Sequence, residues 1–194
     1  MKASVTHPYH NTTNRIHPVK FAMWIALASI TMMFGAFTSA FIVRKAAGNW
    51  LVFELPSVFY LSTIILLISS ITLHSAYKSF VKEKWMAYKL LLSATLGLGV
   101  AFVVMQYVGW TELFSIGVDL KGNPSGSFLY VLTGVHALHV IGGIAALIVA
   151  MINAFSLKQK VTNRRKLNFE ITLHYWHFVD LLWVYLLVFL ILSI

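Results

Sequence analysis

Five long stretches without a lysine, arginine or glutamate constrain this chain more than any other feature of its sequence. They run over Phe21–Val43, Leu55–Tyr77, Leu90–Thr111, Gly122–Leu157 and Ile171–Ile194, and Asp180 is the one charge inside them. Each can hold the roughly 20 apolar residues that cross a hydrocarbon core. The fourth opens with the turn formers GNPSGS, so we expect its helix to start near Ser127. The sequence therefore predicts an all-α, polytopic membrane protein with five transmembrane helices.

Composition excludes the main soluble alternatives. Hydrophobic residues make up 59% of the chain and charged residues 11%, whereas about a quarter of a soluble domain is charged. The formal charge of +9 does not indicate a nucleic-acid partner, because the basic residues lie between the apolar blocks, as in membrane proteins. The absence of cysteine excludes disulfides, thiolate metal ligands and cysteine nucleophiles.

The distribution of lysine and arginine predicts the orientation. Twelve of the fifteen fall on the side of the N-terminus, while Arg44, Lys45 and Lys121 fall on the other. The positive-inside rule then places the N-terminus in the cytoplasm and the C-terminus outside. Residues 1–20 are polar and lack a signal-peptide pattern, so we interpret them as a cytoplasmic arm, followed by a five-helix bundle over residues 21–194.

Small residues at every fourth position are typical of closely packed membrane helices. Three such stripes occur: Thr31, Gly35 and Ser39; Ser93, Gly97 and Ala101; Gly142, Ala146 and Ala150. They predict seams between helices, although the same spacing is common in membrane helices in general.

Ionisable side chains within the last two apolar stretches are the candidate functional residues. They are His136 and His139 in the fourth stretch, and Glu170, His174, His177 and Asp180 in or beside the fifth. In antiparallel neighbouring helices that rise about 1.5 Å per residue, His136 matches Asp180 in depth and His139 matches His177. We therefore expect contacts among these four near mid-membrane, with Glu170 and His174 nearer the inner surface.

Three interpretations of these groups remain open. Imidazoles and carboxylates are adequate metal ligands, but the Glu-x-x-His pairs of a di-iron bundle are missing. Ionisable groups in a bilayer are costly and often functional, which favours a proton route. They can also form a hydrogen-bonded seam between helices, with Tyr175, Trp176 and Trp183 as packing and hydrogen-bonding aromatics. His74, near the inner end of the second stretch, is expected to face the headgroups.

The run FEITLHYWHFVDLLWVYL resembles subunit III of the haem–copper oxidases, the family of cytochrome c and quinol oxidases. The family's pattern of Phe-Glu, then Tyr-Trp-His-Phe-Val-Asp, then Trp is matched by Phe169, Glu170, residues 175–180 and Trp183. The preceding GSFLYVLTGVHALHVIGG is similar to a second family segment, matched at Gly126, Ser127, Phe128, Thr133, Gly134, His136, His139 and Val140. A weaker likeness extends over nearly the whole chain.

The resemblance implies an accessory subunit of a bacterial terminal oxidase in the cytoplasmic membrane. Such a subunit has no catalytic centre, haem or metal of its own; haem and copper belong to partner subunits. It packs on subunit I, in a complex with subunit II and other respiratory subunits, and supports assembly, sustained turnover and proton uptake. Membrane lipids are expected partners and phospholipid a candidate ligand, while the electron donor, cytochrome c or quinol, stays open.

The chain departs from the family's long form, which has seven helices, and matches its last five. Ile30 stands where the family has a membrane carboxylate, and Gly109 and Trp110 replace a glutamate and a tyrosine that follow the matched Gln106. A subunit III-like component of nitric oxide reductase is therefore an alternative. A small membrane transporter or metal-binding protein is an alternative from another class, although broken helices and matched halves, which favour a transporter, are not visible.

Overall fold

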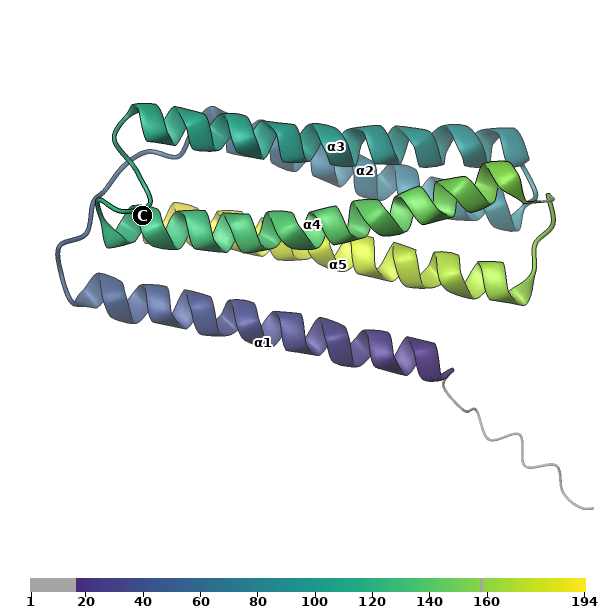
Figure 1. The fold of residues 1–194 in the computed structure, drawn as a ribbon, viewed down its shortest axis with the longest axis horizontal. Coiled ribbons are helices and arrows are strands. Elements are labelled where there is room, and N and C mark those ends of the chain that lie inside the picture. The colour runs from purple at the N-terminus through teal and green to yellow at the C-terminus, as the bar shows by residue number, and fades with distance from the viewer. Residues whose placement is uncertain (1–16, 158) are drawn as a thin grey trace, which may run out of the picture.

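The computed structural model describes residues 17–157 and 159–194, which form five long helices and no strand (Figure 1). The helices are α1 (Pro18–Ala46), α2 (Ser57–Val81), α3 (Trp85–Ser115), α4 (Pro124–Ser156) and α5 (Asn163–Ser193). All five are long and apolar enough to cross a membrane. The predicted all-α architecture of five transmembrane helices is confirmed. Most of the predicted arm lies outside the described residues, and residues 18–20 already belong to α1.

Capping side chains place two helix starts earlier than predicted. α4 begins at Pro124, because Asn123 accepts a hydrogen bond from the Ser125 amide at 3.0 Å and proline suits a first helical position. α5 begins at Asn163, eight residues before the predicted span, and Thr162 caps it by accepting from the Arg165 amide. The absence of charge marks the part of a helix that crosses lipid, whereas the cap marks where the helix begins.

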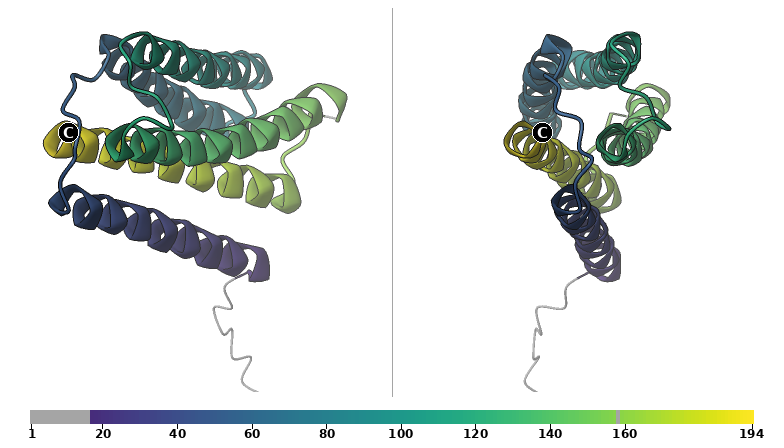
Figure 2. Two further views of the ribbon diagram at one scale, coloured as in Figure 1. Left: turned by 60° about the vertical axis from the view of Figure 1, so that its left-hand side comes forward. Right: turned by 90° about the vertical axis from the view of Figure 1, so that its left-hand side faces the viewer.

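Helices α2 to α5 form a four-helix bundle, and α1 lies against one side of it (Figures 1 and 2). Within the bundle α2 packs on α3 and α5, and α4 packs on α3 and α5, while α1 contacts α4 and α5 only. α5 contacts both α1 and α2, which do not contact each other, so α5 lies between them. The end-on view in Figure 2 shows α2, α5 and α1 in a row along one side of the molecule.

The tightest approaches between helices occur at glycines outside the predicted stripes, although a Cβ added at the predicted Gly142 would lie in ordinary contact with the Tyr175 hydroxyl of α5 at 3.5 Å. A Cβ added at Gly99 would lie 2.7 Å from the ring of Trp176, and one at Gly143 would lie 2.9 Å from the same ring. Gly35 and Gly97, by contrast, have no atom within 4 Å of such a Cβ. The predicted seams through Gly35 and Gly97 are therefore wrong within this chain. Four-residue spacing identifies a smooth helix face, but many faces of a membrane helix are smooth.

Candidate functional site

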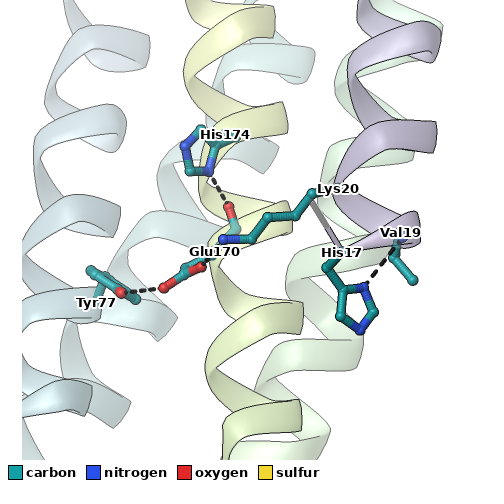
Figure 3. Close-up of polar contacts among 6 residues, drawn as sticks. All are labelled: His17, Val19, Lys20, Tyr77, Glu170 and His174. Carbon is teal, nitrogen blue, oxygen red and sulfur yellow. Dashed lines mark hydrogen bonds and ion pairs between the residues drawn. The ribbon is translucent and has the colours of Figure 1, made fainter. Parts of the chain in front are cut away.

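The carboxylate of Glu170 ties three helices together at one end of the bundle (Figure 3). Its Oε2 accepts a hydrogen bond from Lys20 Nζ of α1 at 2.7 Å, and its Oε1 accepts one from the Tyr77 hydroxyl of α2 at 2.8 Å. The Lys20 side chain is 38% exposed and that of Glu170 18%. Both carboxylate oxygens are thus occupied, which suits a structural clasp near the membrane surface.

Three imidazoles continue from this clasp along α2 and α5. The ring of His174 donates through Nδ1 to the Glu170 carbonyl at 2.6 Å (Figure 3). His177 is hydrogen-bonded through Nδ1 to the Ser70 hydroxyl of α2, and its ring centroid lies 6.0 Å from that of His74. His74 and His174 are exposed and His177 is half-buried. His74 therefore joins the other two imidazoles, one helical turn inward from Tyr77.

His136 and Asp180 are the buried ionisable groups in the middle of the bundle. Both ring nitrogens of His136 and both carboxyl oxygens of Asp180 lack a hydrogen-bond partner among the described residues. Aromatic rings surround His136, with the Trp183 centroid 5.0 Å away and Phe102 at 6.0 Å. The Ser70 hydroxyl of α2 is hydrogen-bonded to His177 and not to Asp180.

The expected contacts among His136, His139, His177 and Asp180 are not formed as a hydrogen-bonded set in the part of the chain that the structure describes. His139 donates through Nδ1 to the Val135 carbonyl of its own helix, and His177 turns to Ser70 of α2. Depth fixes the level of a residue and not the direction in which it points, so the contacts expected among these four side chains stay a prediction. A different residue joins α4 to α5: the Tyr175 hydroxyl donates to the His139 carbonyl at 3.0 Å.

The two tryptophans of α5 are fixed by hydroxyl groups of α2. Trp176 donates through Nε1 to Ser69 Oγ at 3.1 Å, and Trp183 donates to Thr63 Oγ1 at 2.9 Å. Sequence reasoning missed these α2 partners, as it missed Lys20, Tyr77 and Ser70. Thr63 and Ser70 are seven residues apart, a spacing that places these two α5-binding hydroxyls on one helix face, and Ser69 lies beside them. That spacing was the available signal.

The chemistry of these groups is hydrogen bonding and ion pairing between helices. Among residues 17–157 and 159–194, no group of three or more histidine, aspartate or glutamate side chains lies close enough to hold a metal ion. The titratable groups are instead distributed over one end of the bundle, its side and its centre. The residues that could exchange protons with water are those near the clasp, since His136 and Asp180 are buried.

The family model and the relatives that match this chain all carry the name of the same oxidase subunit. The family model described as cytochrome c oxidase subunit III matches residues 4–193. A relative from Nocardia farcinica, named a probable cytochrome c oxidase subunit 3, is 30% identical over 94% of this chain and 91% of its own length. Cytochrome c oxidase subunit 3 of Pelomedusa subrufa is 34% identical over 69% of this chain and 48% of its own. The chain thus spans about half the length of several relatives that it matches.

One further relative carries two subunits in a single chain. A haem–copper oxidase subunit I+III of Aeropyrum pernix is 28% identical over 85% of this chain, which covers 21% of that protein. In that protein the segment similar to this chain is a minor part of a larger oxidase polypeptide.

Proposed function

We propose, from the premise that this chain belongs to the cytochrome c oxidase subunit III family, that it is an accessory, non-redox subunit of a terminal oxidase. The observation that carries the proposal is the family match over residues 4–193, together with a bacterial relative aligned over nearly its whole length. In this role the chain packs on subunit I and stabilises the complex during oxygen reduction. The fused subunit I+III relative supports the contact with subunit I.

The arrangement of the ionisable groups supports a structural role more directly than a redox one. Glu170 is satisfied by Lys20 and Tyr77, and the buried tryptophans are satisfied by hydroxyls. We assign haem and copper to the partner subunits. Support of proton uptake is the finer part of the proposal, and the groups near the cytoplasmic clasp are its candidates.

Co-purification tests the proposed function. A tagged chain extracted gently from a bacterial cytoplasmic membrane is expected to bring a haem–copper subunit I, seen as a haem spectrum, whereas the isolated chain shows no haem. Its deletion is expected to leave oxygen reduction present but less durable over repeated turnovers. One equivalent of haem or transition metal on the isolated chain contradicts the proposal. Co-purification with a nitric oxide reductase alone favours that enzyme as the partner.

The orientation belongs to the same proposal. The clasp residues Lys20 and Glu170 lie at the end of the bundle where most lysines and arginines gather, so we place this end in the cytoplasm. Single cysteines at positions 83, 121 and 163 test it, because the chain has no cysteine of its own. An impermeant thiol reagent is expected to label only position 121 in intact cells. Labelling at position 163 contradicts this topology.

A recess of about 900 Å³ beside the clasp is our candidate for bound phospholipid. Its lining has one carboxylate, that of Glu170, which pairs with Lys20. The remaining charges of the lining, Arg164 and Lys166, are basic and suit an anionic headgroup. Replacing Arg164 and Lys166 with glutamine is expected to lower the anionic phospholipid that native mass spectrometry detects on the purified chain. Unchanged lipid retention would remove the recess from the proposal.

A further inference from the structure

Three imidazoles lie on α2 and α5, on the side of the bundle where Figure 2 shows α5 between α2 and α1. Two of these imidazoles are exposed and one is half-buried. We call this side the histidine face and define it by His74 of α2 and by His174 and His177 of α5. Trp24 of α1 borders it, with its ring 6.3 Å from that of His174. Because α1 and α2 do not contact each other, no helix among residues 17–157 and 159–194 covers the histidine face.

The imidazoles of this face keep unused hydrogen-bonding groups. His74 has no hydrogen-bond partner among the described residues, and His174 and His177 use only Nδ1. His174 and His177 lie four and seven residues beyond Glu170, which is about 6 and 10 Å deeper along α5. Lipid chains offer no partner at that depth, and ionisable groups there normally face protein or a water-filled cavity.

The opposite side of the bundle shows what a lipid-facing surface of this protein looks like. Its exposed side chains are apolar, for example Val104 of α3 and Leu138, Ile141 and Val149 of α4. Both sides belong to helices that cross the same membrane, yet of these two sides only the first carries imidazoles. The contrast indicates that the histidine face is covered by something other than acyl chains.

The hydrogen bonds that are already made restrict the chemistry of what covers the face. His174 donates through Nδ1 to the Glu170 carbonyl, so in a neutral ring its Nε2 is an acceptor and requires a donor. Hydroxyl and amide side chains donate and also accept, so they can serve His74 and His177 in either tautomer. Such side chains join helices across membrane interfaces.

We propose that the histidine face is the docking surface for a transmembrane helix of a second subunit, which presents hydroxyl or amide side chains to the imidazoles. The inference deepens the proposed function, on which it rests for the identity of that subunit as the haem–copper subunit I. The partner helix lies along α5 between α2 and α1, with its polar side chains on the cytoplasmic half and apolar ones opposite Leu181.

Site-specific crosslinking tests the location of the docking surface. Leu181, four residues beyond His177, is 70% exposed on the proposed side, and Leu138 of α4 is 66% exposed on the other. The two lie within about one helical turn in depth, since Trp183 and His136 are in ring contact. Each is replaced by cysteine in the otherwise cysteine-free chain and carries a thiol-linked photocrosslinker in native membranes. We expect a protein adduct at position 181 and lipid adducts at position 138.

Two results overturn the inference and leave the proposed function intact: lipid adducts alone at position 181, or a subunit I adduct only at position 138, while a haem–copper oxidase still co-purifies. If no haem protein accompanies the unsubstituted chain, the proposed function fails instead. An adduct at position 181 with a membrane protein other than subunit I would overturn the inference, because the histidine face would then not be the subunit I contact.

Substitution of the imidazoles tests the chemistry. His74→Leu with His174→Leu removes two of the three imidazoles of the face and leaves the His177–Ser70 hydrogen bond in place. It is expected to weaken association about eightfold, the effect of two membrane hydrogen bonds of ordinary strength. The matched pair His74→Gln with His174→Gln keeps donors and acceptors and is expected to retain association. Equal retention in both pairs contradicts hydrogen-bonded docking, and helical circular dichroism of each variant confirms folding.

Discussion

The α2–α5 bundle and the outlying helix α1 use different means to stay in place. The bundle closes around Trp176, whose ring contacts Gly99 of α3 and Gly143 of α4 while its Nε1 binds Ser69 of α2. A single side chain of α5 thus touches every other helix of the bundle. The difference teaches that five helices of similar length and composition are not equivalent, because close approach and hydrogen bonding are concentrated in four of them.

α1 is held mainly in its C-terminal half. Phe41 is fully buried there, with ring centroids of Trp50 at 4.6 Å and Phe189 at 5.1 Å, and the Thr38 hydroxyl is hydrogen-bonded to that of Tyr185. In the N-terminal half the contacts of α1 with α5 include the Lys20–Glu170 ion pair and the Trp24–His174 ring contact. We therefore expect α1 to separate from the bundle before the bundle itself unfolds.

Truncation of the two aromatic anchors is the sharpest way to break this comparison. Trp176→Ala is expected to destabilise the whole bundle by about 3 kcal/mol, the low end of the range for truncated core aromatics. We use the low end because no hydrophobic driving force holds helices together within lipid. Phe41→Ala is expected to leave bundle unfolding in detergent unchanged and to raise hydrogen exchange along α1. Equal losses of global stability in both variants would show that α1 and the bundle form one cooperative unit.

The glycines test how closely the bundle packs. Gly99→Ala places a Cβ 2.7 Å from a Trp176 ring that also contacts Gly143, so the ring cannot move freely aside. We expect a loss of about 1–3 kcal/mol in unfolding free energy, the usual cost of overpacking. Gly97→Ala, on the same helix, meets no atom within 4 Å and serves as the matched control. Similar stabilities of the two variants would argue against the tight contact at Trp176.

The sequence was sufficient for the number and class of the helices and insufficient for their rotation. The thickness of the bilayer sets the apolar length that each span needs, whatever its neighbours are, so five spans could be predicted. The direction of a side chain depends on which neighbour a helix face meets. For that reason the depth match of His136 with Asp180 could be proposed, whereas the turning of His177 to Ser70 could not. The motif residues pointed to a family, but not to the α2 hydroxyls that fix them.

The clasp between Lys20 and Glu170 offers the smallest expected effect and refines the comparison at the N-terminal end of α1. Ion pairs as exposed as this one contribute little, about 0.5 kcal/mol, because water and salt screen them. Lys20→Gln is therefore expected to raise hydrogen exchange in the first turns of α1 by roughly two- to threefold, and added salt should produce a similar rise in the unsubstituted chain. Tyr77→Phe removes the other hydrogen bond to Glu170 without contacting α1, so it should leave that exchange unchanged. A tenfold or larger increase for Lys20→Gln, insensitive to salt, would mean that the ion pair holds α1 as firmly as the buried contacts of Phe41. The N-terminal end of α1 would then be fixed to the bundle as firmly as its C-terminal end.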